Sequence, residues 1–222
     1  KPEDIPMDDP AIYQMISQGD TDGVFQLEGG GMRTFLTNMQ PENFEDIIAA
    51  ISLYRPGPME SIPRYIAGKR DPASVHYETP QLAPILDVTY GCMVYQEQVM
   101  QIVRDLAGYS YGRSDLVRRA MAKKKKDVMA AERKNFVYGS EKEHVPAAVN
   151  RGVPAAVTDH IFDEMTAFAS YAFNKAHSVG YAVIAYQTAW FKCYYPGEYM
   201  AALMTSVLDS SVKISEYIAE CK

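Results

Sequence analysis

The sequence predicts a mainly α-helical protein with a few short strands, and two observations carry the prediction. Apolar residues recur at the i, i+3, i+4, i+7 spacing of an amphipathic helix in three separate stretches. Segments with the apolar composition of strands are few and only four residues long. The helical stripes lie at 44–51, 99–106 and 161–169, and the strand-like segments lie at 24–27 and 92–95.

The first half of the chain is expected to combine helices with irregular backbone. The stretch 55–90 contains six prolines and is predicted to be rich in loops, because proline ends helices and favours turns. It separates the first helical stripe from the second. The two stripes consist of Phe44, Ile47, Ile48 and Ile51, and of Val99, Ile102, Val103 and Leu106.

The second half is expected to be almost entirely helical. Thr158 stands where it can cap the helix that carries the third stripe. The segment 179–194 is apolar nearly all round, which is typical of a buried central helix. Pro196 would end that helix and occupy the first turn of the next. The residues expected to point inward from this last helix are Tyr199, Met200, Leu203, Met204 and Val207.

Charge is distributed unevenly along the chain. The 222 residues carry a net charge of −6, but residues 104–134 hold ten basic and four acidic side chains. Such separation indicates one face suited to polyanions on an otherwise acidic body. No apolar run approaches the roughly 18 residues that span a bilayer. Three widely spaced cysteines indicate free thiols in a reducing cytoplasm, and the absence of an initial Met suggests a fragment of a longer protein.

The first candidate for binding chemistry is the basic run 118–126. Ser114 is predicted to cap its helix, on which Arg119 and Lys123 would share a face. Arg118 and Arg119, followed one turn later by lysines, suit a triphosphate or a nucleic-acid backbone, because guanidinium groups make paired contacts to phosphate oxygens. The alternative is a solvated basic face. The lysines concerned are Lys123, Lys124, Lys125 and Lys126.

The second candidate is the segment 168–178, where aromatic and small residues alternate before the predicted buried helix. A helix N-terminus is a natural anion site. Lys175 would supply charge, Asn174 a hydrogen bond, and His177 a donor or a flat steric wall. The alternative is an ordinary connector in which Asn174 and Ser178 act as caps.

The third candidate is Arg55, which Pro56 holds out of the α-helical conformation. A residue held in this way suits a structural ion pair, which we favour, or a phosphate contact.

No metal site is expected within the chain. Asp20 and Asp22 resemble paired metal-binding carboxylates, but 19–23 has the composition of a polar turn. The remaining histidines, His76, His144 and His160, have no partners at metal-ligand spacing in the sequence.

Taken together and in order, these stretches resemble the C-family bacterial replicative DNA polymerases, specifically the polymerase III alpha subunit. The resemblance runs from about residue 20 to about residue 205. The similar blocks are GVFQLE at 23–28, GMR at 31–33, FEDIIA at 44–49, LYRPGP at 53–58, TYG at 89–91, YQEQVMQI at 95–102, LAGY at 106–109, RRAM at 118–121, FNK at 173–175, YQTAW at 186–190 and YPGE at 195–198.

The resemblance implies a helical fingers domain at 29–222, preceded at 1–28 by the end of the palm. It implies template-directed DNA synthesis by the parent chain, with Mg²⁺ held by palm carboxylates outside this fragment, which we therefore expect to be inactive alone. The implied partners are the deoxynucleoside triphosphate, primer-template DNA, the palm and other domains of the parent, and replisome subunits. An open alternative is a non-catalytic module that holds DNA backbone, and another is a scaffold whose basic helix docks on an acidic partner.

The resemblance also implies roles for individual residues. Those expected to bind the nucleotide are Arg55, Arg118, Arg119, Lys123, Asn174, Lys175 and His177, with His177 helping to exclude a ribose hydroxyl. Those expected to contact DNA are Lys124, Lys125 and Lys126.

Overall fold

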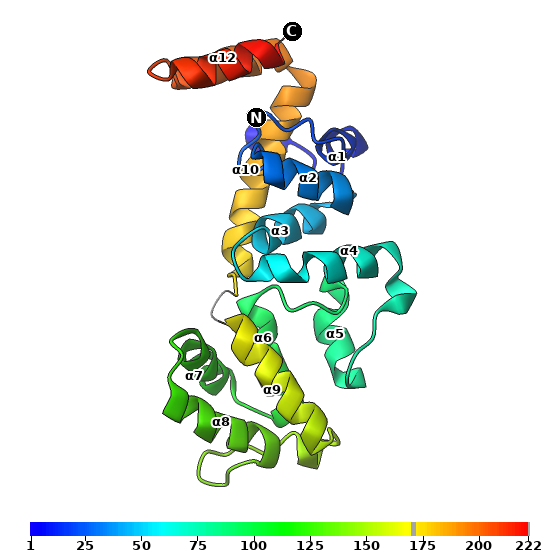
Figure 1. Cartoon of the computed structure of the whole chain (residues 1–222), viewed down its shortest axis with the longest axis vertical. Coiled ribbons are helices and arrows are strands. Elements are labelled where there is room, and N and C mark those ends of the chain that lie inside the picture. The colour runs from blue at the N-terminus through cyan, green and yellow to red at the C-terminus, as the bar shows by residue number, and fades with distance from the viewer. Residues whose placement is uncertain (170–171, 222) are drawn as a thin grey trace. The chain divides into compact units, whose positions relative to one another are not determined.

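The computed structural model describes residues 1–169 and 172–221, and regular structure in that part of the chain is helical (Figure 1). The mainly α prediction is confirmed. Of the two predicted strands, 24–27 instead forms consecutive turns. The segment 92–95 is not assigned as a strand, and among the described residues it forms one bridge, a parallel pairing of Tyr95 with Phe173.

The chain divides into two compact units. One contains Lys1–Tyr54 together with Ala176–Lys222, and the other contains Arg55–Lys175. The predicted end of the palm at residue 28 coincides with neither division and stays a prediction.

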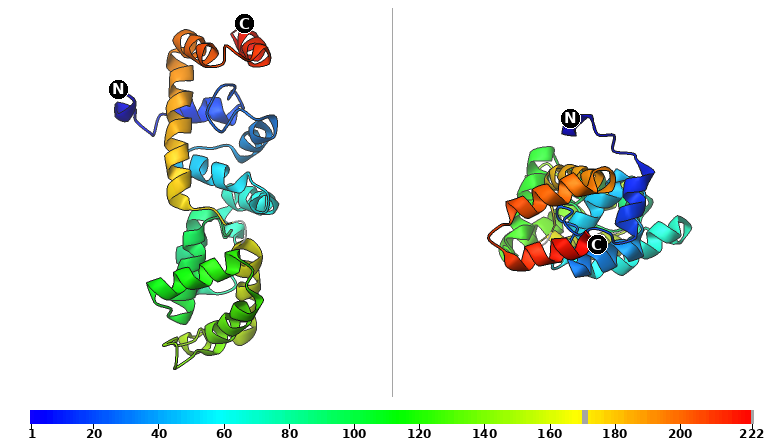
Figure 2. Two further views of the ribbon diagram at one scale, coloured as in Figure 1. Left: turned by 90° about the vertical axis from the view of Figure 1, so that its left-hand side faces the viewer. Right: turned by 90° about the horizontal axis from the view of Figure 1, so that it is seen from above.

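The unit formed by the two chain ends is built from six α-helices within the described residues. Side-chain caps start several of them, since Asp9 accepts a hydrogen bond from the Ala11 amide and Asn43 accepts one from the Asp46 amide. Figure 2 shows α11 and α12 lying side by side. The helices are α1 (Pro10–Ser17), α2 (Gly30–Met39), α3 (Phe44–Leu53), α10 (Lys175–Tyr194), α11 (Pro196–Ser206) and α12 (Ser211–Glu220), with a short 3-10 turn η1 (Pro2–Asp4) before them.

Helix α10 is less buried than its composition predicted. Its buried positions form one stripe rather than a complete surface, and Ile184 and Tyr194 are exposed. Pro196 does open α11 as predicted, but Met200 is the fully buried member of the expected inward set. The buried stripe of α10 consists of Ser178, Ala182, Ala185, Tyr186, Ala189 and Lys192.

The unit at 55–175 is organised around α6 (Gln96–Ala107). Its apolar face packs against α7 (Tyr111–Ala122), α8 (Lys126–Tyr138) and α9 (Ala155–Ala169) in one continuous core. The stretch 55–90 is more helical than expected. It contains η2 (Pro58–Ser61), α4 (Ile62–Arg70), η3 (Pro72–Ser74), η4 (Pro80–Leu82), α5 (Ala83–Leu86) and η5 (Asp87–Thr89), and η6 (Val149–Arg151) follows α8.

Two predicted helix caps are wrong because the helices begin earlier than the apolar pattern indicated. Ser110, rather than Ser114, caps α7 by accepting a hydrogen bond from the Arg113 amide. Ser114 lies one turn inside, buried, where its hydroxyl donates to the Tyr111 carbonyl. Thr158 is likewise inside α9, and its hydroxyl donates to the Pro154 carbonyl. Each hydroxyl therefore donates its hydrogen bond to a backbone carbonyl of the preceding turn instead of capping a helix.

No α-helix in the described ranges is both long enough and apolar enough to cross a membrane.

Gly108 ends α6 in the left-handed conformation, with φ of 76°. A methyl group at this position would stand 2.8 Å from Cγ of Pro146, which is closer than carbon atoms pack. We expect Gly108→Ala to lower the free energy of unfolding by at least about 1 kcal/mol, because backbone strain and the clash add together. The matched control is Gly112→Ala inside α7, where the new methyl meets nothing within 4 Å. Urea denaturation of both variants should show loss only for Gly108→Ala, and equal stabilities would contradict the assignment.

Candidate functional site

The start of α6 is fixed by the buried side chain of Gln98. Its Oε1 accepts hydrogen bonds from the amides of Val94 and Tyr95, at 2.8 and 2.9 Å. Its Nε2 donates to Oγ1 of Thr89 at 2.7 Å and to the carbonyl of Ile85 at 3.3 Å. These four bonds hold the extended segment before α6, so that Gln96 and Glu97 stand at the first turn.

Gln96 joins two segments that are far apart in sequence. Its backbone amide donates to the Phe173 carbonyl at 2.9 Å, and its side-chain Nε2 donates to the Ala172 carbonyl at 2.8 Å. Its Oε1 accepts from Nη1 of Arg118 at 3.0 Å. The predicted basic helix and the predicted 168–178 segment therefore meet at one side chain. Within that segment, Ser170 and Tyr171 lie outside the described residues.

Asp115 holds both predicted arginines. Its Oδ1 accepts from Nε and Nη2 of Arg118, at 3.0 and 2.7 Å, and its Oδ2 lies 2.6 Å from Nη2 of Arg119. These hydrogen bonds, chiefly those from Arg118, hold the pKa of Asp115 below its usual value. The Arg118 side chain is only 19% exposed, whereas that of Arg119 is 62% exposed. Arg118 is thus a fixed group, and Arg119 is the one that solvent reaches.

The Glu97 carboxylate accepts hydrogen bonds from the residues that start α10. Its carboxylate accepts from Nδ2 of Asn174 at 2.9 Å and from the amide of Lys175 at 3.0 Å. The Lys175 ammonium lies 5.2 Å from the centre of the Tyr95 ring. A carboxylate therefore already takes the anion position that we predicted at this helix N-terminus.

Arg55 packs on an aromatic ring. Its Cζ lies 3.7 Å from the centre of the Phe173 ring, a cation–π contact that the sequence did not predict. Because Phe173 bonds to Gln96 through its backbone, Arg55 belongs to the same group of contacts.

Lys123 is the C-cap of α7, and its backbone amide still donates to the Arg119 carbonyl at 3.1 Å, one helical turn before it. The lysines after Lys123 do not continue the helix. The helix ends at Ala122, and Lys124 adopts a left-handed conformation with φ of 50°. The chain turns there and starts α8 at Lys126. All four lysines, from Lys123 to Lys126, are exposed.

His177 lies in the other compact unit, within α10. It is exposed, and its ring centre is 4.3 Å from that of Tyr181. Its predicted role at the sugar stays a prediction.

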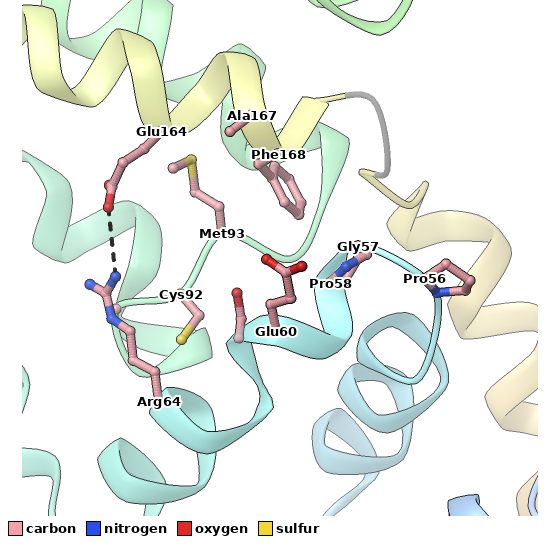
Figure 3. Close-up of a pocket in the computed structure, with 12 residues that line it drawn as sticks. Pro56, Gly57, Pro58, Glu60, Arg64, Cys92, Met93, Glu164, Ala167 and Phe168 are labelled. Carbon is pink, nitrogen blue, oxygen red and sulfur yellow. Dashed lines mark ion pairs between the residues drawn. The ribbon is translucent and has the colours of Figure 1, made fainter.

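A cavity of about 350 Å³ lies beside the Pro56–Pro58 turn (Figure 3). Arg64 and Glu164 face each other across it, with Nη1 and Oε1 3.8 Å apart. Burial raises the pKa of the Cys92 thiol in its wall to about 11, which leaves this cysteine protonated and unreactive at neutral pH.

Sequence reasoning missed the acceptors that organise the site. Gln96 and Glu97 lie in a recognised block, but nothing local links them to residues 118 and 172–175. Asp115 precedes the two arginines by three and four residues, and that spacing is the sequence signal for its contacts with them. Near the cavity, α9 also brings His160 and Glu164 close to Glu78, a grouping that the sequence did not reveal.

Comparisons with known proteins identify relatives of the chain. The family model described as bacterial DNA polymerase III alpha subunit finger domain matches residues 1–144, about two thirds of the chain. The DNA polymerase III subunit alpha of Staphylococcus aureus (strain N315) is 44% identical over 220 residues, covering 99% of this chain and 20% of that protein. The one from Thermus aquaticus is 47% identical over 223 residues, covering 98% and 18%. The chain spans about a fifth of the length of these curated relatives.

The lowered pKa of Asp115 makes stability depend on pH in a definite direction. The carboxylate contributes stability above its unfolded pKa of about 4, and that contribution is lost as pH falls through the lower folded value. We expect Asp115→Asn to reduce the free energy of unfolding at pH 7 by up to about 1 kcal/mol. The difference from the parent chain should shrink below pH 4. Asp105→Asn is the control. Arg151 donates to the backbone carbonyl of Asp105 and not to its carboxylate, so this substitution keeps that contact. A pH-independent difference would contradict the ion-pair explanation.

Proposed function

The chain belongs to the finger-domain family of bacterial DNA polymerase III alpha subunits, and on that premise we propose that the junction of α6, α7 and residues 172–175 binds the triphosphate of an incoming deoxynucleotide. The parent chain would be a DNA-directed DNA polymerase of the bacterial cytoplasm. It would act on primer-template DNA together with its palm, its other domains and the replisome subunits.

One observation carries the proposal. Gln96 bonds Arg118 and the backbone at 172–173 at the same time, so basic groups from two distant segments stand around one helix start. A phosphate-binding surface needs positive charge at fixed positions, because catalysis of phosphoryl transfer depends mainly on positioning and charge neutralisation. The Gln96 junction supplies such fixed positions.

The two arginines would divide the work. Arg118 is committed to Asp115 and Gln96 and would act by holding its neighbours in place. Arg119 is exposed and shares only one oxygen of Asp115, so a polyphosphate can compete for its guanidinium. A triphosphate carries more negative charge than one carboxylate and should win that competition.

The surrounding residues would complete the site. Arg55 and Lys175, each placed over an aromatic ring, would add positive charge. Lys123 would assist at the end of α7. Asn174 would hydrogen-bond phosphate or sugar. His177 belongs to the other compact unit, and its exclusion of a ribose hydroxyl is proposed from the family resemblance alone.

The carboxylates at Asp20 and Asp22 do not fit a Mg²⁺ site. Nζ of Lys192 lies 2.5 Å from Oδ1 of Asp20, and Arg33 pairs with Asp22. We therefore assign the metal ions of DNA synthesis to the palm of the parent enzyme and no metal-dependent step to these residues.

The lysine turn favours a second contact, with DNA backbone. Lys124 and Lys125 are exposed between α7 and α8, and the adjacent Lys126 is exposed as the first residue of α8. We propose that they bind primer-template phosphates, a role that they could also fill in a non-catalytic DNA-binding module.

Arg119→Ala should weaken binding of a deoxynucleoside triphosphate to the chain about tenfold or more, because a charge-assisted hydrogen bond contributes about 1.5–3 kcal/mol. Calorimetric titration with primer-template present measures the loss. Arg104→Ala is the matched control, an exposed arginine in the last turn of α6, at the opposite end of that helix from Gln96. Equal affinities for the Arg119→Ala variant and the parent chain would overturn the proposed nucleotide site.

Replacing Lys124, Lys125 and Lys126 with alanine should reduce the salt dependence of DNA binding. Each lost phosphate contact lowers the slope of log K against log salt concentration by roughly 0.7–0.9, so the triple variant should lose about two units or more. Fluorescence anisotropy over a salt series measures this slope. A Lys134→Ala/Lys142→Ala variant removes exposed lysines elsewhere in the same unit and should change it less. If the triple variant keeps the parent slope, these lysines do not contact DNA.

A further inference from the structure

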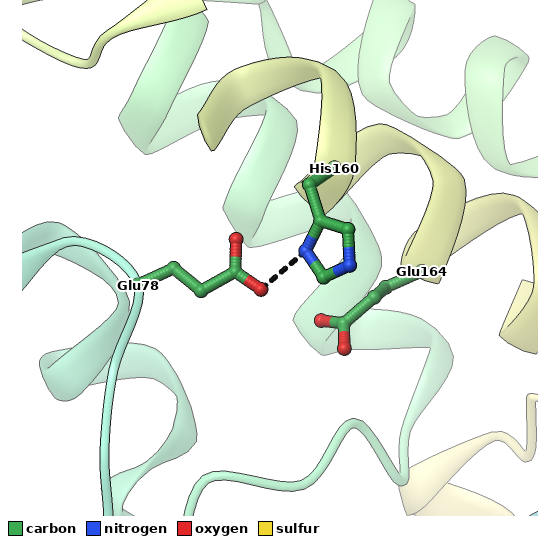
Figure 4. A group of neighbouring side chains, drawn as sticks. All are labelled: Glu78, His160 and Glu164. Carbon is green, nitrogen blue, oxygen red and sulfur yellow. Dashed lines mark hydrogen bonds and ion pairs between the residues drawn. The ribbon is translucent and has the colours of Figure 1, made fainter. Parts of the chain in front are cut away.

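Three side chains able to bind a metal ion meet beside α9. His160 and Glu164 lie one turn apart on that helix, and Glu78 reaches them from the segment before η4 (Figure 4). Nδ1 of His160 is 2.5 Å from Oε1 of Glu78, and one donor atom from each residue lies within 4.8 Å of the others. We propose that Glu78, His160 and Glu164 bind a first-row divalent cation of the Zn²⁺ type.

The fold holds the two sides of this cluster firmly. Ile161, Phe162 and Met165 of α9 are buried in the core, which fixes the helix and leaves His160 and Glu164 on its more accessible side. Thr79, next to Glu78, is buried, and its carbonyl accepts a hydrogen bond from the Leu82 amide. The backbone on both sides is therefore anchored, while the three side chains keep freedom to adjust.

The donor set fits such a cation. One imidazole nitrogen and two carboxylate oxygens are ligands that Zn²⁺ accepts, and three protein ligands leave a fourth position for water. Bonds of about 2.0–2.2 Å place ligand atoms roughly 3.4 Å apart in a tetrahedral site. A bound ion would therefore require Nδ1 of His160 and Oε1 of Glu78 to move apart from 2.5 Å, and the widest donor spacing, at most 4.8 Å, to close. The exposed fractions of the side chains, 28% for Glu78, 62% for His160 and 36% for Glu164, leave room for that movement.

The local charge favours a cation. Glu78 and Glu164 bring two carboxylates to one place, and the guanidinium of Arg64 stays 3.8 Å from Glu164, beyond hydrogen-bonding distance. A divalent ion would neutralise both carboxylates and tie the segment before η4 to α9. The competing explanation is that the contacts with His160 and Arg64 already satisfy these carboxylates.

Isothermal titration of the chelator-treated 222-residue chain with Zn²⁺ tests the proposal. A Cys193→Ser/Cys221→Ser background removes the two thiols that solvent reaches most easily. We expect one equivalent of Zn²⁺ to bind. His160→Asn and Glu164→Gln should each weaken that binding at least about tenfold. His144→Asn, at an exposed histidine with φ of 53° that asparagine tolerates, should leave it unchanged.

A second readout keeps the test independent of folding defects in a variant. Co²⁺ bound in place of Zn²⁺ should shift the proton resonances of the His160 ring in the unaltered chain and leave those of His144 in place. Circular dichroism shows whether each variant is folded. Absence of Zn²⁺ binding, binding that requires the cysteines, or unchanged binding in folded His160→Asn would each overturn the proposal. None of these results bears on the nucleotide site.

Discussion

Where α6 begins is decided by the buried amide of Gln98, and the rest of the candidate site follows from that start. Four hydrogen bonds from one side chain hold the extended backbone in front of the helix. A buried amide left without partners would be costly, so this arrangement is strongly specified. Gln96 and Glu97 consequently stand at the first turn, where one meets Arg118 and the other meets residues 174–175.

The same start closes a long loop of chain. The bridge between Tyr95 and Phe173 and the two bonds from Gln96 join segments separated by more than seventy residues, with α7, α8 and α9 folded between them. Closing such a loop is entropically unfavourable, and a few hydrogen bonds alone would not sustain it. The continuous apolar core of the unit at 55–175 offsets that entropy, and the polar junction then sets the register.

Local patterns in the sequence predicted the helices well and the contacts between them poorly. The apolar stripes at 44–51, 99–106 and 161–169 correspond to α3, α6 and α9, because a helix that buries one face has apolar residues at the helical spacing. The caps were misplaced because Ser114 and Thr158 also bond within a helix to the preceding turn. The sequence singled out the basic residues of the candidate site, whose binding role stays a prediction. It did not single out Gln96 and Glu97, since their side-chain partners include residues 22 and 77–78 positions away. No local pattern records a pairing at that distance.

Asp115 is a shared acceptor, and this makes the two arginines thermodynamically dependent on each other. If one arginine is removed, the other can bond both oxygens of the Asp115 carboxylate. The remaining guanidinium would then be held more tightly and would be less available to another anion. The effects of the two single arginine substitutions on ligand affinity should therefore not add in the double variant. The size of the difference would measure how strongly the carboxylate competes with a ligand. If the proposed site binds a polyanion, the Asp115 carboxylate would set the strength of that binding as well as the orientation of the arginines.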